Sequence, residues 1–323
     1  MATKIKAGII GGAGYTAGEL LRLLINHPQV EVAFVHSTSN AGAPVTDVHE
    51  GLIGETDLTF ADKYDLASCD VLFLCQGHGF SRKFWEENVM PAGLKVVDLA
   101  QDYRDESDGY VYGLPEVKRD AVRACDRLAN PGCFATAIQL ALAPLAAAGL
   151  LDGEVHVTGI TGSTGAGVKP GSTTHFSWRN NNMSVYKAFE HQHLKEIKQT
   201  LSGLQGGKVP DISFIPVRGD FARGIFVMAD ITTSLTQDEA VKLYKDFYAD
   251  AEFTHVSDRP VDLKQVVNTN KCVISLEKHG DKLLILSAID NLLKGASGQA
   301  VQNMNLMFGL PERTGLALKP SAF

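Results

Sequence analysis

Residues 4–24 read KIKAGIIGGAGYTAGELLRLL, and this stretch decides the fold of the amino-terminal part of the chain. Lys4–Ile10 has the short apolar pattern of a β-strand, and Thr16–Asn26 carries leucines at helical spacing. A glycine-rich turn joins the two. The order strand, glycine turn, helix is the context in which such a turn binds a dinucleotide.

The glycine turn predicts a nucleotide site. Small residues there let backbone N–H groups and the helix start approach a pyrophosphate. The alternative is a tight strand–helix turn that binds no ligand, because a glycine pattern alone is a weak signal. The residues expected to contact the cofactor are Gly11, Gly14, Tyr15 and Thr16.

The end of the second predicted strand, Val30–Val35, bears on which dinucleotide binds. It is followed by HSTSN at 36–40. An NAD site usually has Asp or Glu here to bind the ribose 2′-hydroxyl, and this stretch has neither. The hydroxyls of Ser37 and Ser39 suit a 2′-phosphate, which favours NADP. The alternative is a serine-rich surface loop.

The remaining patterns predict an α/β fold with two domains. In the first part, apolar strand-like runs alternate with helical ones, which predicts a Rossmann-type parallel sheet. After residue 133, strand-like runs alternate with period two, which predicts an α+β domain with a mixed sheet. The apolar runs are 4–10, 30–35, 70–75 and 94–99 in the first part, and 155–160, 211–217, 224–231, 271–276 and 282–289 in the second. Helical patterns are expected at about 191–201, 237–250 and 296–308.

Composition narrows the class of protein. The chain has 323 residues, of which 45% are hydrophobic, and a formal net charge of −7, so a nucleic-acid partner is not expected. We find no signal-peptide layout and no apolar run of membrane-spanning length, which favours the cytoplasm. Five irregularly spaced cysteines without a CxxC pair argue against a disulfide framework or a thiolate metal site, and no metal is predicted.

A cysteine follows an Asn-Pro-Gly turn in ANPGCFATAIQLAL, residues 129–142. Pro131 and Gly132 allow a sharp bend, and a helix is expected from about Phe134. Cys133 then lies at the helix start, where the dipole and N–H groups favour a thiolate and stabilise an oxyanion. The alternative is a small buried residue. A thiolate beside a nicotinamide points to one chemistry, the interconversion of an acyl thioester and an aldehyde.

These motifs resemble the N-acetyl-gamma-glutamyl-phosphate reductase family, within the wider group that includes aspartate-semialdehyde dehydrogenase. The resemblance rests on GGAGYTAGELLRLL (11–24), DLAQDYR (98–104), YGLPE (112–116), ANPGCFAT (129–136), GSTGAG (162–167), RGIF (223–226) and DNLLKGASGQAVQNMN (290–305). It implies an NADP-binding domain at 1–132 plus about 296–323, and a catalytic and oligomerisation domain at 133–295. It also implies that Asn291 contacts NADP and that the chain forms a homo-oligomer, a dimer or a tetramer.

The resemblance further implies a reaction. The thiolate of Cys133 attacks the acyl phosphate of an N-acylated glutamyl phosphate, phosphate leaves, and a thioester remains. Reduction by NADPH and collapse of the hemithioacetal release the semialdehyde. This is a step of arginine biosynthesis, and its partners are small molecules rather than nucleic acids or membranes.

The acid or base of that reaction is left open. The family pattern places a histidine after Pro216, and Val217 stands there instead. His191 and His193, in a segment resembling the family's HRH with Gln192 in place of arginine, are our candidates, because imidazole is suited to proton transfer near neutral pH. The alternative is that both bind substrate or cap the following helix. His175 and Asp220 are weaker candidates.

Four further residues are candidates for substrate binding. Arg104 and Arg223 carry guanidinium groups that suit a phosphate or a carboxylate, and Asn130 lies in the cysteine motif. Arg218 stands where the family has an apolar residue, so a carboxylate on a longer acyl group such as N-succinyl could pair with it. The alternative for each arginine is an exposed side chain or an ordinary salt bridge.

Two other functions remain open from the sequence. Aspartate-semialdehyde dehydrogenase performs the same chemistry on a shorter substrate, although NPGCFAT and HQHLKEI resemble the glutamyl branch. A nicotinamide-sensing regulator without turnover would explain the missing histidine. A sensor has no need of a thiol at a helix start, which favours an enzyme.

Overall fold

The computed structural model describes residues 4–321, and the chain divides into two compact units. Unit 1 comprises Met1–Pro131 and Ala296–Ala317, and unit 2 comprises Gly132–Gly295 and Leu318–Phe323. Of the described residues, 318–321 group with unit 2, whereas the sequence analysis placed them in the first domain. The division after Pro131 falls two residues before Cys133, within the Asn-Pro-Gly-Cys motif.

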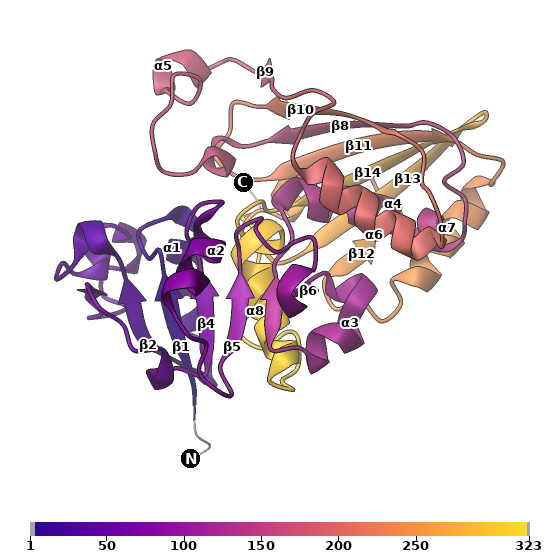
Figure 1. Cartoon of the computed structure of the whole chain (residues 1–323). Coiled ribbons are helices and arrows are strands. Elements are labelled where there is room, and N and C mark those ends of the chain that lie inside the picture. Colours follow the sequence, from indigo (N-terminus) through magenta and orange to yellow (C-terminus); the bar gives the residue numbers. More distant parts are fainter. Residues whose placement is uncertain (1–3, 322–323) are drawn as a thin grey trace. The chain divides into compact units, whose positions relative to one another are not determined.

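Unit 1 contains a parallel sheet, as its sequence pattern predicts, and Figure 1 shows its strands in the indigo and magenta part of the ribbon. All neighbouring strands of this sheet pair in parallel. β1 lies between β2 and β4, so the strand order reverses there, and ligands of such sheets bind beyond the strand ends at this point. The strands are β1 (Ile5–Ile10), β2 (Val30–His36), β3 (Phe60–Ala61), β4 (Val71–Leu74), β5 (Lys95–Asp98), β6 (Val111–Tyr112) and β7 (Arg127–Ala129), in the order β3-β2-β1-β4-β5-β7-β6.

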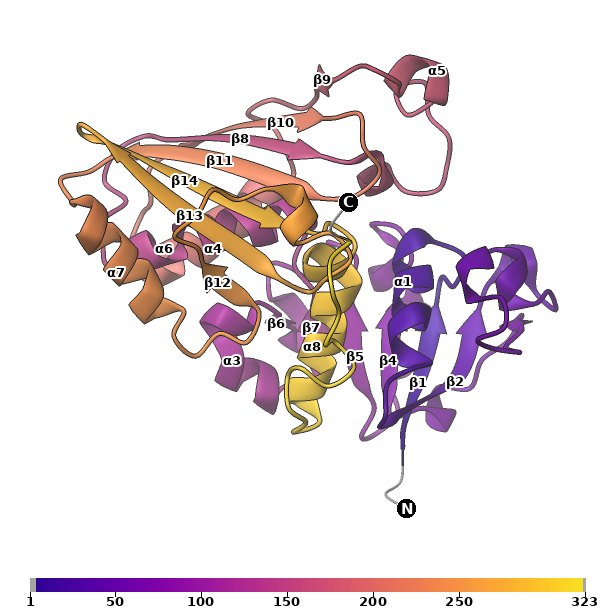
Figure 2. The ribbon, with the colours of Figure 1, turned by 180° about the vertical axis from the view of Figure 1, so that it is seen from behind.

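The helices of unit 1 bury their apolar sides against this sheet. α1 has leucines at helical spacing, which are buried, and it packs beside α8, as Figure 2 shows. Every residue of α8 is buried, including amides that hydrogen-bond within the unit: the Nδ2 of Asn303 donates to the carbonyl of Gly113 at 2.9 Å. These hydrogen bonds fix the position of α8, the last helix of the chain, within unit 1. The helices are α1 (Tyr15–Leu24), α2 (Phe80–Glu87), α3 (Pro115–Ala124) and α8 (Gly298–Met307).

Unit 2 contains the mixed sheet that the period-two patterns predict. β8 pairs in parallel with β10, and β12 with β13, while the remaining pairs are antiparallel. The structure adds short strands, β9 and β12, at the two edges. The strands are β8 (Val155–Thr161), β9 (Ser184–Val185), β10 (Ile212–Arg218), β11 (Ile225–Thr232), β12 (Thr254–Val256), β13 (Cys272–His279) and β14 (Lys282–Ile289), in the order β12-β13-β14-β11-β8-β10-β9.

Helices α4, α6 and α7 of unit 2 cover one face of that sheet, and the short α5 lies apart in the loop before β9 (Figure 1). α4 is the central one: residues from Phe134 to Ala146 are buried, and it packs on β11, β13 and β14 and beside α6 and α7. Residues of β11 alternate between buried and half-buried, as expected of a strand with one covered face. The helices are α4 (Cys133–Ala147), α5 (Phe176–Arg179), α6 (His193–Gln205) and α7 (Gln237–Phe247).

A proline lies inside α4 and is accommodated by a tyrosine. Pro144 has no N–H, so the carbonyl of Leu140 lacks its helical donor. The hydroxyl of Tyr248, just after α7, donates to that carbonyl at 2.5 Å, and the hydroxyl of Tyr244 donates to the carbonyl of Ala141 at 2.6 Å. The buried carbonyl is therefore satisfied, and α4 continues to Ala147.

Candidate active site

The glycine turn of unit 1 has the geometry of an anion site. Gly11 has a positive φ of 85°, and a Cβ there would lie 2.9 Å from backbone atoms of Cys75 and Gln76. At Gly14, the residue before α1, a Cβ would meet nothing nearer than an oxygen at 3.9 Å, and no side chain caps the helix start. An uncapped helix start beside open space fits a phosphate. Tyr15 is exposed and Thr16 half-buried on the first turn.

The end of β2 carries a cluster of neutral polar groups. The Nδ2 of Asn40 donates to the Oγ of Ser37 at 3.1 Å and to the Oγ of Ser39 at 3.0 Å. No carboxylate occurs between residues 36 and 40 to accept from a ribose 2′-hydroxyl. Hydroxyl and amide donors fit a 2′-phosphate, so the residues present fit NADP better than NAD.

The cysteine of the Asn-Pro-Gly turn is the first residue of α4. The helix begins at Cys133 itself, one residue before the predicted start, and Gly132 before it is extended. Thr136 fixes this turn, because its N–H and its hydroxyl both donate to the carbonyl of Gly132, at 2.8 and 3.0 Å. The side chain of Cys133 is half-buried and not in a disulfide. It therefore lies where the helix dipole favours a thiolate.

A glycine from the far end of unit 2 packs directly against this cysteine. A Cβ on Gly295 would lie 2.8 Å from the Cβ of Cys133 and 3.2 Å from its Cα. Gly295 belongs to a π-helical turn, Leu293–Ser297, and its N–H donates to the carbonyl of Asp290 at 2.9 Å. Only a residue without a side chain fits there, so this turn forms one wall around the cysteine.

The two candidate histidines lie at the start of α6 and contact each other. The Nδ1 of His191 accepts from the backbone N–H of His193 at 3.2 Å, so the proton of a neutral His191 is on Nε2. Burial, and then the charge of Lys187, lower the pKa of His191 to about 4. His191 is therefore a neutral hydrogen-bond donor near pH 7. Its ring lies 5.7 Å from that of Phe134, the residue after Cys133.

Glu196 connects these histidines to the cysteine turn, and the sequence analysis missed it. One oxygen of Glu196 lies 3.8 Å from the Nε2 of His193, and the other accepts from the N–H of Gly132 at 3.1 Å. Glu196 is three residues after His193 on the same helix, so both face one side. That spacing is the signal from which it could have been found.

Tyr186 and Arg218 form a second group near the thiol. The guanidinium of Arg218 lies over the ring of Tyr186, 4.7 Å from the ring centre. Burial, and then the negative charge of Cys133, raise the pKa of Tyr186 to about 12. Arg218 pairs with no carboxylate in the described part of the chain, and its buried Nε has no hydrogen-bond partner there. The sequence analysis did not select Tyr186.

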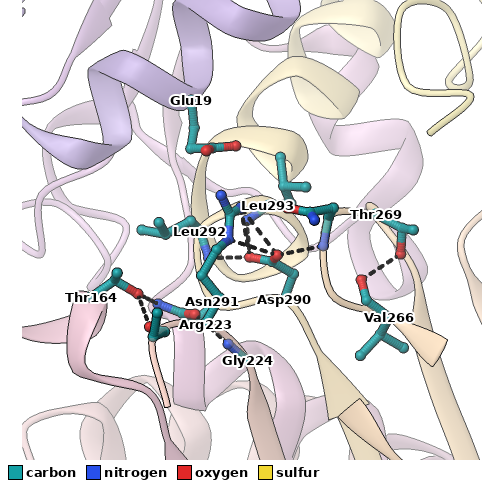
Figure 3. A network of polar contacts seen from close by, with 12 residues as sticks. Glu19, Thr164, Arg223, Gly224, Val266, Thr269, Asp290, Asn291, Leu292 and Leu293 are labelled. Carbon is teal, nitrogen blue, oxygen red and sulfur yellow. Dashed lines mark hydrogen bonds and ion pairs between the residues drawn. The ribbon is translucent and has the colours of Figure 1, made fainter. Parts of the chain in front are cut away.

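Arg223 is held by a buried carboxylate (Figure 3). Its Nε and Nη2 donate to the two oxygens of Asp290, each at 3.1 Å. Asp290 also accepts from the backbone N–H groups of Asn268, Leu292 and Leu293, between 2.8 and 3.1 Å. The bidentate pair fixes the orientation of the guanidinium. Asp290 was not predicted from the sequence.

Asn291, expected to contact NADP, uses its amide within unit 2. Its Oδ1 accepts from the N–H of Gly224 at 2.7 Å, and its Nδ2 donates to the Oγ1 of Thr164 at 3.0 Å (Figure 3). Asn291 therefore joins the loop of the GSTGAG motif to the start of β11. A contact with NADP stays a prediction.

Arg104 and Asn130 lie together in unit 1, under the segment that leads to the cysteine. Arg104 donates from Nε to the carbonyl of Asn130 at 2.9 Å and from Nη2 to the carbonyl of Leu99 at 3.1 Å. The Nδ2 of Asn130 donates to the carbonyl of Ala296, and its Oδ1 accepts from Asn303. Both side chains brace this segment, and their role with substrate stays a prediction.

The two weaker candidates for the base, His175 and Asp220, hold a loop. The Nδ1 of His175 accepts from the N–H of Ser177 at the start of α5, and Asp220 accepts from the N–H of Asn181 at 2.6 Å. Neither observation connects them to Cys133.

The other cysteines differ from Cys133 in their surroundings. Burial raises the pKa of Cys69 to about 11 and that of Cys125 to about 11. Burial, and then the charge of Asp98, raise the pKa of Cys75 further. Cys272 is buried beside a serine hydroxyl. The thiols of Cys69, Cys75 and Cys125 therefore remain protonated near pH 7 and are poor nucleophiles.

Two features are absent from residues 4–321. No helix there is both long and apolar enough to cross a bilayer. No group of three or more His, Cys, Asp or Glu is arranged to hold a metal ion in that range.

Comparison with known proteins places the chain in a family. The protein-family model "Semialdehyde dehydrogenase, NAD binding domain" matches residues 6–125. A second family model, "Semialdehyde dehydrogenase, dimerisation domain", matches residues 133–291. The N-acetyl-gamma-glutamyl-phosphate reductase of Bacteroides thetaiotaomicron is 62% identical over 321 residues, covering 99% of this chain and 100% of that protein. That of Flavobacterium johnsoniae is 52% identical over 325 residues, with the same coverage.

The chain belongs to the N-acetyl-gamma-glutamyl-phosphate reductase family. The resemblance drawn from the motifs is thereby confirmed. Among solved structures, aspartate semialdehyde dehydrogenase II of Vibrio cholerae aligns with a TM-score of 0.75 at 16% identity, over 95% of this chain and 99% of that one. The aspartate semialdehyde dehydrogenase of Candida albicans, solved with NADP, aligns with a TM-score of 0.71 at 16% identity. This alignment also covers 95% of this chain and 99% of that one. At that identity the likeness shows the fold.

Replacing Gly295 by alanine should slow alkylation of Cys133 by iodoacetamide at pH 7 by about tenfold or more, because the added methyl displaces the thiol from the helix start. Peptide mapping by mass spectrometry measures the rate. Gly203→Ala, on α6 with open space around it, is the matched control and should leave the rate unchanged. Equal rates in both variants would show that Gly295 does not position the thiol.

Proposed function

We propose that this chain is an NADPH-dependent reductase of N-acyl-gamma-glutamyl phosphate that acts through a thioester on Cys133. The observation that carries the proposal is the placement of Cys133 as the first residue of α4, in a chain that matches reductases of this family over 99% of its length. The product is the glutamate gamma-semialdehyde together with inorganic phosphate. Such a reaction serves amino-acid biosynthesis in the cytoplasm, here that of arginine.

The chain's residues account for the bond changes. The sulfur of Cys133 bonds to the acyl carbon, the carbon–oxygen bond to phosphate breaks, and inorganic phosphate leaves. N–H groups at the start of α4 stabilise the oxyanion of each tetrahedral species. NADPH, when bound, supplies the hydride that reduces the thioester. The oxyanion then collapses, the carbon–sulfur bond breaks, and the thiolate is regenerated.

In this proposal, His191 and His193 are the candidates for donating a hydrogen bond or a proton to the oxyanion before it collapses. His191 is neutral with a proton on Nε2, so it donates a hydrogen bond to developing negative charge without charge of its own. The carboxylate of Glu196 lies 3.8 Å from the Nε2 of His193, and we propose that it limits the positions that this imidazole takes. Val217 is buried and apolar in β10, and cannot take this role.

Substrate anions require cationic or amide groups. Arg223, oriented by Asp290, is our candidate for the phosphate or the substrate carboxylate. Arg104 of unit 1 donates a hydrogen bond to the carbonyl of Asn130, shortly before Cys133. We propose that Arg104 and Asn130 also bind the phosphate or the carboxylate of the substrate. Ser37, Ser39 and the glycine turn would hold NADP.

The reverse reaction tests the proposal. N-acetyl-glutamate semialdehyde, inorganic phosphate and NADP should give phosphate-dependent NADPH, followed at 340 nm, and Cys133→Ser should abolish it because a hydroxyl is far less nucleophilic than a thiolate. Cys272→Ser, at a buried thiol, is the matched control and should retain the rate.

Two outcomes would replace the proposal. Turnover of aspartate semialdehyde in place of the glutamate semialdehyde would make the chain an aspartate-semialdehyde dehydrogenase. Binding of NADP without turnover of either aldehyde would identify a nicotinamide-sensing regulator.

Arg218 favours a second candidate for the acyl group. Its guanidinium lies 4.7 Å from the ring centre of Tyr186, whose pKa is raised by burial and then by the negative charge of Cys133. Arg218 has no carboxylate partner in the described part of the chain, and its buried Nε has no hydrogen-bond partner there. An unpaired cation in a partly buried place is costly unless a ligand supplies the anion. An N-succinyl group ends in a carboxylate, whereas an N-acetyl group ends in a methyl. We therefore propose N-succinyl-gamma-glutamyl phosphate as an alternative substrate.

Substitution of Arg218 separates the two acyl groups. The unmodified chain should have the higher kcat/KM for N-succinyl-glutamate semialdehyde, and Arg218→Ala should reduce that value about 10–100-fold while changing the value for the acetyl aldehyde little. Arg259→Ala, at an exposed arginine of unit 2, is the control. Equal or better turnover of the acetyl aldehyde by the unmodified chain would rule out the succinyl candidate.

We also propose that the chain forms a homo-oligomer through the face of the unit 2 sheet opposite α4. Met228 of β11 is half-buried there and pairs with Thr158 and Leu286, which are also half-buried. A largely apolar sheet face of this kind is typical of a surface that a second subunit covers. The match to a model described as a dimerisation domain supports this placement.

Sedimentation velocity checks the oligomer. Met228→Glu should shift the main species of the unmodified chain toward the mass of one chain, because the carboxylate would be buried without a partner. Lys195→Glu, at an exposed position of α6, should leave the distribution unchanged. An unchanged distribution in both variants would place the interface elsewhere.

A further inference from the structure

A histidine outside the family motifs contacts the glycine turn of unit 1. The Nε2 of His49 lies 2.7 Å from the carbonyl oxygen of Gly12. A carbonyl oxygen only accepts, so Nε2 carries the proton and donates it. The segment around His49 is anchored, because its N–H donates to the carbonyl of Val45 at 2.9 Å and its carbonyl accepts from Leu52 at 2.9 Å, and both of these neighbours are buried.

The same imidazole lies against the first turns of α1. A Cβ on Gly18 would lie 2.6 Å from the Nδ1 of His49 and 2.9 Å from its Cε1. On another side the ring is tilted against Phe60, with 6.2 Å between the ring centres. The imidazole is therefore held between α1 and Phe60, and a residue larger than glycine at position 18 would displace it.

The hydrogen bond from His49 fixes the direction of a backbone group in the turn. The N–H of Gly12 already donates to the carbonyl of His36 at 2.8 Å, so both polar groups of Gly12 have partners. The carbonyl of Gly12 and the N–H of Ala13 belong to one trans peptide, and the two point in opposite directions. Holding the carbonyl toward His49 therefore aims the N–H of Ala13 away from it.

We propose that His49 is a positioning residue for the cofactor: it holds the glycine turn in the conformation that receives the pyrophosphate. The inference rests on the proposed function, since it assumes that NADPH binds at this turn. A turn ordered before binding loses less conformational entropy when the ligand arrives. Loss of His49 therefore weakens cofactor binding and leaves the chemistry on Cys133 intact.

Titration of NADPH by its fluorescence, together with steady-state kinetics, tests the inference. His49→Ala should raise the Kd and the KM for NADPH about tenfold, while kcat at saturating NADPH stays within about twofold. His49→Gln places an amide N–H near the position of Nε2 and should restore the Kd to within about threefold. His279→Ala, at an exposed histidine, is the matched control and should change nothing.

Gly18 supplies an independent arm of the same test. Gly18→Ala should raise the Kd by a similar factor, because the methyl displaces the imidazole. In the double variant with His49→Ala the methyl finds open space, so its Kd should equal that of His49→Ala alone. If His49→Ala does not fold, as judged by its thermal midpoint, Gly18→Ala and His49→Gln decide the question.

The outcomes separate this inference from the function beneath it. An unmodified chain that does not bind NADPH overturns the proposed function. If the unmodified chain binds NADPH, then an unchanged Kd in His49→Ala, a fall in kcat without a change in Kd, or additive effects in the double variant would each overturn the role of His49.

Discussion

The buried carboxylate of Asp290 is the group on which the arrangement of unit 2 depends. It accepts from the guanidinium of Arg223 and from three backbone N–H groups, and it is fully buried. A buried charge is stable only when it is paired and hydrogen-bonded in this way. The backbone carbonyl of the same residue accepts from Gly295, the glycine that packs on Cys133. Asp290 therefore fixes two residues at once: Arg223, a candidate for substrate binding, and Gly295, which packs against Cys133.

The periodic patterns of the sequence predict much of the fold, because periodicity reports local geometry and burial together. β1, α1, β8, β11 and β14 lie within a few residues of their expected ranges. The short edge strands β9 and β12, with two and three residues, lie below the length at which alternation can be recognised. Helix α4 differs only in beginning at the cysteine rather than after it.

The candidate site is predictable only where its residues are close in sequence. Cys133 follows from its own turn, and His193 from its neighbours. Asp290 and Arg223 are 67 residues apart, and only the fold brings them together. Tyr186 lies in an irregular segment whose course no periodicity specifies. Glu196 is the exception, since its helical spacing from His193 was available in the sequence. His49 was missed because its partner is a backbone carbonyl 37 residues away, which leaves no pattern of side chains.

The proline of α4 has a consequence for the order in which the chain acquires its structure. The carbonyl of Leu140 receives its donor from Tyr248, 108 residues later. During synthesis on the ribosome, the first half of unit 2 therefore emerges before the residue that donates to the carbonyl of Leu140. This carbonyl receives its hydrogen bond only after α7 and Tyr248 have been synthesised. A chain truncated before α7 would therefore have Cys133 at the start of a helix in which one buried carbonyl has no hydrogen-bond donor.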